Sequence, residues 1–213
     1  MRSLLRLILW TAIIAASVIG LARATAIRWW RVPLDDPWLG VSLSPTLNPG
    51  DWVILWRLTR PSQGDLVVCP EPKAPERIVV ARVFGTANDD VDSAGGALRL
   101  NGRIPPSEGK CSGFQIVHPK TGAFVDQYCG VENLEGHLHL RGDLADPSAA
   151  NTTSKTTAVE PGRFFLASDN RRFFFDSRDY GTVEAASCKE TVVFRLWSKD
   201  GYFNPTGRFE YIH

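Results

Sequence analysis

One segment of the sequence places a hydroxyl group in a setting suited to nucleophilic chemistry. Residues 40–51 read GVSLSPTLNPGD, a turn rich in serine, proline and glycine that leads into an apolar run. Ser42 stands near the start of this turn. A serine hydroxyl becomes a good nucleophile only when a neighbouring base takes its proton. Ser42 is therefore a candidate nucleophile whose base must come from elsewhere in the chain.

Other polar residues give weaker signals for chemistry. His137 and His139 lie two residues apart and so on one face of a strand, but no third ligand accompanies them, and a solvated strand face is the better interpretation. Asp89, Asp90 and Asp92 lack the spacing and the glycine of a calcium loop, so they indicate a turn. The sequence predicts no metal site and no cofactor.

The N-terminal residues differ in composition from the rest of the chain. Residues 7–22 carry no charge, and with the leucines just before them they approach the roughly 20 apolar residues that cross a bilayer. Trp29 and Trp30 follow at the depth of a membrane interface. We expect residues 1–31 to form an uncleaved anchor with its flanks. A cleavable signal peptide is the alternative, because residues 22–24 fit a small-x-small cleavage site.

Composition restricts what the remaining residues can be. The chain has 44% hydrophobic and 22% charged residues, which is typical of a globular protein. Five of its 24 basic residues and none of its 23 acidic ones lie before residue 32, so residues 32–213 carry 19 − 23 = −4 charges. A body with this balance lacks the basic surface of a nucleic-acid-binding protein. We therefore expect no nucleic-acid partner.

Four cysteines indicate an oxidising compartment. None of them forms a C-x-x-C pattern, and an even number behind a membrane or export segment suits two disulfides. Cys111 with Cys129 is the favoured pair, which leaves Cys69 with Cys188; two other pairings and four free thiols stay open. We expect a single-pass protein of the cytoplasmic (inner) membrane, with its body on the periplasmic or extracytoplasmic side.

The body is predicted to be mainly β and antiparallel. Its apolar runs are short, rich in β-branched and aromatic residues, and separated by Gly, Pro and Asn. We expect an antiparallel sheet or barrel-like domain over residues 32–213, with an insertion-like subregion at 103–160. The predicted strands are those at 52–56, 65–69, 77–84, 163–168 and 191–197.

Several blocks of the sequence, taken in order, resemble the type I signal peptidase family. These enzymes are membrane-bound serine endopeptidases that remove signal peptides from exported preproteins. The end of the chain, PTG at 205–207 through His213, is also similar to the tail of proteobacterial members. The blocks that carry the resemblance are GVSLSPTLNPGDWV at 40–53, PSQGDLVV at 61–68, ARVFG at 81–85, SDNR at 168–171 and DSRDYG at 176–181.

The resemblance implies a serine–lysine dyad, in which a buried neutral lysine takes the serine proton. Ser42 occupies the nucleophile position, and its backbone amide would contribute to the oxyanion hole. The lysine position is Ala81. Two supporting positions also depart from the family: Phe174 replaces a polar residue that orients the lysine, and Gly40 replaces a hydroxyl residue of the oxyanion hole. Restoring all three positions together is expected to recover activity best.

The resemblance also implies a scaffold around this site. Asp169 with Arg171, and Asp176 with Arg178, would form charged pairs that brace the active-site strands. The chain entering Ser42 would form an open edge beside the strand at 77–84, where an extended peptide pairs with the backbone.

Further implications concern the membrane and the function. Trp29, Trp30 and Trp52 or Trp56 would face membrane lipid. One function is a protein that engages the cleavage regions of signal peptides in preproteins with little or no cleavage, alone or beside an active signal peptidase or another membrane subunit. The alternative is a fully active peptidase with an unrecognised base such as Lys73. The chemistry at position 81 favours the first.

Overall fold

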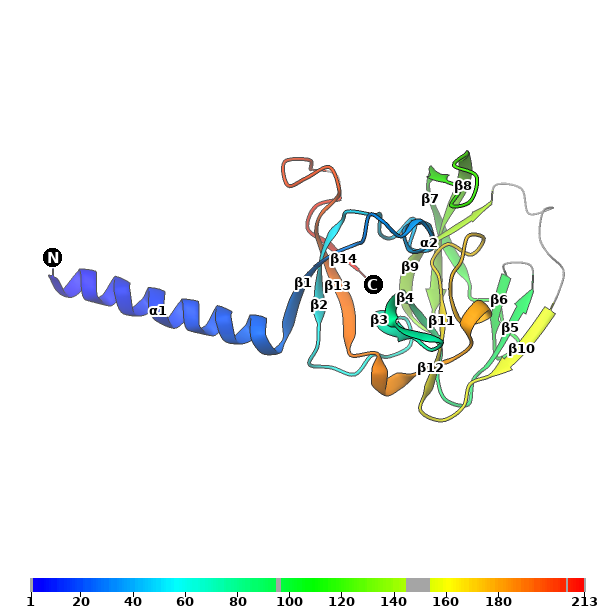
Figure 1. Ribbon diagram of the computed structural model, residues 1–213, viewed down its shortest axis with the longest axis horizontal. Coiled ribbons are helices and arrows are strands. Elements are labelled where there is room, and N and C mark those ends of the chain that lie inside the picture. Colours follow the sequence, from blue (N-terminus) through cyan, green and yellow to red (C-terminus); the bar gives the residue numbers. More distant parts are fainter. Residues whose placement is uncertain (1, 95–96, 145–153, 206, 213) are drawn as a thin grey trace.

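The computed structural model describes residues 2–94, 97–144, 154–205 and 207–212 (Figure 1). Helix α1, Arg2–Thr25, projects away from the body, and its described side chains are almost all exposed. Within Ser3–Thr25 an 18-residue window has a mean hydropathy of 2.2, which makes this helix long and apolar enough to cross a membrane. The helix predicted for the N-terminal apolar run is confirmed.

The body is built from antiparallel strands, as predicted. A large sheet has the order β1-β2-β13-β3-β4-β11-β12, and β14 pairs with β13. Two three-stranded sheets, β10-β5-β6 and β7-β8-β9, lie beyond it, on the side away from α1 (Figure 1). The strands of the large sheet are β1 (Ile27–Arg31), β2 (Trp52–Trp56), β3 (Leu66–Glu71), β4 (Ala74–Gly85), β11 (Arg163–Ala167), β12 (Val183–Glu184), β13 (Glu190–Trp197) and β14 (Glu210–Tyr211). Those of the smaller sheets are β5 (Asp90–Ala94), β6 (Ala97–Leu100), β7 (Ser107–Val117), β8 (Phe124–Leu134), β9 (His137–Leu144) and β10 (Ser154–Ala158).

In the described part of the chain, three short helical segments interrupt the strands. Two are α-helices: α2 (Pro37–Ser42), which precedes β2, and α3 (Ser177–Tyr180), which follows β11. The third, η2 (Ala185–Ser187), is a single 3₁₀ turn between β12 and β13.

Strand β4 separates two apolar clusters because its side chains alternate between the faces of the sheet. Val80 belongs to a cluster with α2 and β2, whereas Val79, Ala81 and Val83 belong to a second cluster with β11 and Tyr180. All four β4 residues are at most 1% exposed. The strand that carries the candidate base position is thus fixed from both sides.

Both disulfides of the favoured pairing are present. Cys69 on β3 is bonded to Cys188, which lies between η2 and β13. This disulfide links a strand at the centre of the large sheet to the segment that leads into β13. Cys111 and Cys129 join β7 to β8. The four cysteines therefore brace the body as the sequence predicted.

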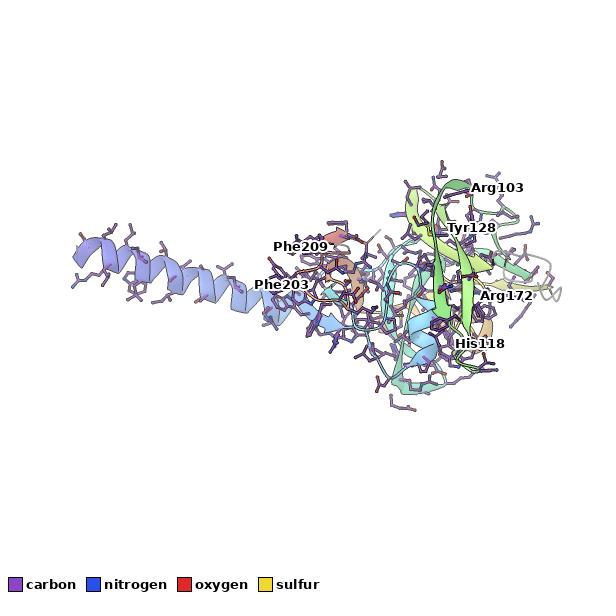
Figure 2. All side chains as sticks on the ribbon, turned by 90° about the horizontal axis from the view of Figure 1, so that it is seen from above. Arg103, His118, Tyr128, Arg172, Phe203 and Phe209 are labelled. Atoms are coloured by element: carbon purple, nitrogen blue, oxygen red, sulfur yellow. A yellow bond between two sulfur atoms is a disulfide. The ribbon has the colours of Figure 1, made fainter. Side chains whose placement is uncertain are left out.

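The C-terminal turn between β13 and β14 adds exposed aromatic residues. Phe203 is 92% exposed and Phe209 51%, and both lie at the end of the body nearest α1 (Figure 2). Tyr202 packs edge-on against both rings. Sequence analysis placed only tryptophans at this end, of which Trp29 is 46% exposed.

Candidate active site

The chain that enters Ser42 is a helix, so the prediction that it forms an open edge beside the strand at 77–84 is wrong. Asp36 caps α2 by accepting a hydrogen bond from the Leu39 N–H (2.9 Å), and Pro37 supplies a preformed first helical residue. This Asp-Pro pair is a recognisable helix start that the sequence analysis did not use. Leu39 is buried in the apolar cluster that includes Val80 of β4.

Ser42 is the last residue of α2 and is only 1% exposed. Its hydroxyl donates to the Leu39 carbonyl one turn earlier (2.9 Å), and its own carbonyl accepts the Asn170 N–H (3.0 Å). In a regular α-helix the N–H of such a residue points back along the axis to the preceding turn. This geometry counts against the oxyanion role expected of the Ser42 amide.

Position 40 needs a glycine because the Pro49 ring leaves no room for a side chain, and not because of its backbone angles. A Cβ atom at this position would lie against the Pro49 ring at a distance that real Cβ atoms do not reach. A serine at position 40 therefore cannot be accommodated without moving the 48–51 turn. This corrects the expectation that restoring a hydroxyl residue here would help catalysis.

Ala81 is completely buried in an apolar environment. Its side chain lies in the cluster with Val79, Val83 and Tyr180, and Phe175 packs on the outside of that cluster. Helix α2 lies against the same strand. The position that the resemblance matches to the family's lysine is therefore occupied by a buried methyl group among apolar side chains.

The neighbouring residue, Arg82, forms the central ion pair of the site. Its guanidinium donates to both oxygens of Asp169 (2.8 and 2.9 Å), and both side chains are fully buried. Asp169 also accepts the Thr46 hydroxyl (2.6 Å), so one carboxylate connects β4 to the turn after Ser42. Burial would raise the pKa of Asp169, but Arg82 outweighs it and the pKa lies below its usual value. Sequence analysis paired Asp169 with Arg171, which is wrong.

The second predicted pair, Asp176 with Arg178, is present. The guanidinium binds both oxygens of Asp176 (2.9 and 2.6 Å), and the carboxylate also caps α3 and accepts the Ser168 N–H (2.7 Å). Phe174, which the resemblance matches to a polar residue that orients the lysine, lies under Arg178, with 3.4 Å from the guanidinium carbon to the ring centroid. The ring therefore offers no hydrogen bond to an amine at position 81.

Arg171 instead bonds to Glu132, which belongs to the β7-β8-β9 sheet. The Glu132 carboxylate also accepts a hydrogen bond from the Arg141 guanidinium (3.2 Å) and lies 3.1 Å from Nε2 of His139. His139 is buried, which corrects the solvated strand face expected for it; His137 is exposed. Burial and the nearby Arg82 lower the pKa of His139 although Glu132 opposes them. The 103–160 subregion thus contacts the SDNR block at 168–171 through the buried Arg171–Glu132 ion pair.

No lysine is placed to act as the base. A lysine must be desolvated to be neutral near pH 7. All six lysines of the chain lie in the described part, and each is exposed. Lys73 lies in the turn between β3 and β4, and Arg77 binds Glu71 (3.2 Å). The six lysines are Lys73, Lys110, Lys120, Lys155, Lys189 and Lys199.

Fold and site together define a mainly β domain behind a long apolar helix, with a buried serine at the end of α2. The sequence profile of the family described as "Signal peptidase, peptidase S26" matches residues 4–197. The chain therefore belongs to this signal peptidase family.

The chain is similar to several proteins named as signal peptidases. Signal peptidase IB of Staphylococcus aureus is 24% identical over 173 residues, covering 78% of this chain and 80% of the relative. Signal peptidase I V of Bacillus subtilis is 23% identical over 148 residues, covering 68% and 74%. A crystal structure of a signal peptidase I from Enterococcus faecalis aligns with 63% of this chain and 97% of its own, at 20% identity and a TM-score of 0.36.

Proposed function

We propose that this protein binds signal-peptide cleavage regions of exported preproteins and cleaves them very slowly or not at all. The observation that carries this proposal is the burial of Ala81 among apolar side chains, at the position that the resemblance matches to the family's lysine. A positioned general base contributes about 10²- to 10⁴-fold to rate. Without it, the hydroxyl of Ser42 keeps its proton.

The surroundings of Ser42 support the same conclusion. The hydroxyl is buried and already donates to a carbonyl, so it is not poised towards an incoming peptide bond. Leu39 and Leu43 pack with Val80 in one closed apolar cluster beside β4. This packing favours a protein whose cleft has lost the chemistry of cleavage.

The edge of β4 supports peptide binding. Val83 exchanges hydrogen bonds with the chain just before β3, at 2.9 Å to residues 64 and 65. Hydrogen-bonding groups alternate along an antiparallel strand, so those of Ile78 and Val80 face the other edge. On that edge β11 pairs only with residues 82–85 of β4, and no strand of the described chain pairs beyond them. An extended peptide could add there as a further strand.

A pair of substitutions at one position tests this mode of binding. Ile78→Pro removes an outward N–H, whereas Ile78→Ala removes a similar amount of side chain and keeps the N–H. With full-length protein in detergent and a fluorescent signal peptide, Ile78→Pro should weaken binding about two- to tenfold more than Ile78→Ala, the value of one hydrogen bond. Equal affinities for the two variants would refute pairing at this edge.

Two further parts of the proposal concern place and partners. The apolar helix α1 and the family support a single-pass anchor in the cytoplasmic membrane with the disulfide-bonded body outside the cytoplasm. A protein that binds signal peptides without cleaving them would act beside an active signal peptidase or another membrane subunit. Co-isolation of such a subunit from detergent extracts would test this association.

A further inference from the structure

A cavity of about 1120 Å³ lies apart from the candidate active site. It opens between the loop after β2, the β3–β4 hairpin and the segment that runs from β12 to β13. Neither Ser42 nor Ala81 lines it. The chemistry expected at Ser42 and position 81 therefore does not account for the cavity.

The floor of the cavity is apolar. Val68 and Ile78 come from the β3–β4 hairpin and Phe164 from β11. The Cys69–Cys188 disulfide crosses the floor and fixes its two sides relative to each other. Ile78 is 39% exposed, so apolar surface remains open to a ligand. A hydrocarbon chain is the chemical group that such a floor suits.

The rim of the cavity is basic, although residues 32–213 carry a net negative charge. Its lining has four cations and two carboxylates, 4 − 2 = +2, and the two carboxylates are Glu184 and Glu190. Glu190 is shared by Arg28 and Arg57. Arg60 and Lys189 have no carboxylate partner within the described part of the chain. These two cations are free to meet an anion such as a phosphate.

The cavity lies at the level where α1 ends. The Arg57 N–H donates to the carbonyl of Ala26 (3.0 Å), the residue directly after α1, so the loop after β2 is tied to the end of the helix. Leu58 on this loop is 62% exposed. In Figure 1 this loop and η2 lie along the lower side of the body, beginning where α1 meets it. If α1 crosses the bilayer, the rim lies in the headgroup layer.

We propose that this cavity binds one anionic phospholipid from the leaflet at which α1 ends. The lipid phosphate would bind Arg60 and Lys189, with Arg57 beside them, and an acyl chain would lie over Ile78 and Phe164. Charge complementarity selects the anionic headgroup, and the apolar floor selects a lipid over a free phosphate. The site would hold the body in a set orientation on the membrane.

Lipid retention by the full-length protein tests the proposal. Native mass spectrometry in detergent would follow binding of phosphatidylglycerol, phosphatidylcholine and inorganic phosphate. Arg60→Gln with Lys189→Gln should weaken phosphatidylglycerol binding roughly 30-fold, because each cation near an anionic lipid is worth about fivefold. Arg99→Gln with Arg103→Gln is the matched control, since both residues are exposed and Arg103 lies at the far end of the body (Figure 2). The control should bind like the unmodified protein.

Each other outcome contradicts the proposal. Equal loss in both double variants would mean that only overall charge matters. Equal binding of phosphatidylcholine would remove the role of the basic rim. Competition by millimolar inorganic phosphate would identify a soluble anion as the ligand. Because Ile78 lies in both proposed sites, displacement of the lipid by a signal peptide would count against a lipid site only if it persisted in Ile78→Pro, and would then identify the cavity as a peptide groove. The melting temperature of the Arg60/Lys189 variant serves as the control for folding. It should not change, because both side chains are exposed and unpaired.

Discussion

The Arg82–Asp169 pair should be the most sensitive charged contact in the body. Asp169 is fully buried and accepts two hydrogen bonds from Arg82 and one from Thr46. Asp169→Asn keeps the shape of the side chain but leaves a buried guanidinium without its counter-charge. Removing one partner of such a pair costs about 3–5 kcal/mol. For a chain of this size that is a fall in melting temperature of roughly 6–20 °C.

The assay is thermal unfolding of the full-length protein in detergent, followed by tryptophan fluorescence at pH 7. Arg77→Gln serves as the comparison, because its side chain is 51% exposed and its ion pair with Glu71 should be worth about 0–1 kcal/mol. A double variant with apolar residues at 82 and 169 should recover much of the lost stability, since it leaves no unpaired charge.

Acid should reproduce part of the same effect. The pKa of Asp169 is lowered in the folded protein, so its contribution is complete above about pH 4, the unfolded value, and is lost as the pH falls further. An Asp169→Asn protein that melts within 2 °C of the unmodified one at pH 7 would falsify the argument that this pair connects β4 to the turn after Ser42.

Three further predictions concern other parts of the molecule. Because the pKa of His139 is lowered, stability should fall as the pH drops below about 6.5, and melting curves at pH 7 and 5 should differ less for His139→Gln; an unchanged difference would contradict this. Ala81→Lys should give little cleavage of a preprotein, Ala81→Lys with Phe174→Ser more, and adding Gly40→Ser should reduce cleavage again through its clash; a gain from Gly40→Ser would show that the turn can move. Trp29 should be shielded from aqueous quenchers in liposomes, and full quenching would place that strand away from lipid.

Much of the architecture could be predicted from local patterns. The run WVILW gives β2, whose Val53 and Leu55 are buried while Trp52 and Trp56 are only half-buried, as strand alternation requires. The preferred cysteine pairing also matched the structure, because Cys111 and Cys129 flank a single hairpin. Such features depend on residues that are close in sequence or share one period.

Contacts between distant segments could not be predicted in the same way. Nothing in the sequence around Arg171 indicates that its partner is Glu132, which reaches it from a separate sheet. The clash of position 40 with Pro49 depends on how α2 and the following turn fold back on each other. Helix α2 itself could have been predicted, because Asp36 and Pro37 form a standard helix start, but the family resemblance suggested an open edge beside the strand at 77–84 instead.

The central claim is that the serine of this signal peptidase family member has no base. The most direct test is the intact mass of a preprotein after incubation with the purified full-length protein, alongside Ser42→Ala and an active signal peptidase. We expect the preprotein mass to remain unchanged, or to shift very slowly, and Ser42→Ala to bind the signal peptide as well as the unmodified protein does. Rapid loss of the signal peptide that disappears in Ser42→Ala would contradict the account and show that a base reaches Ser42.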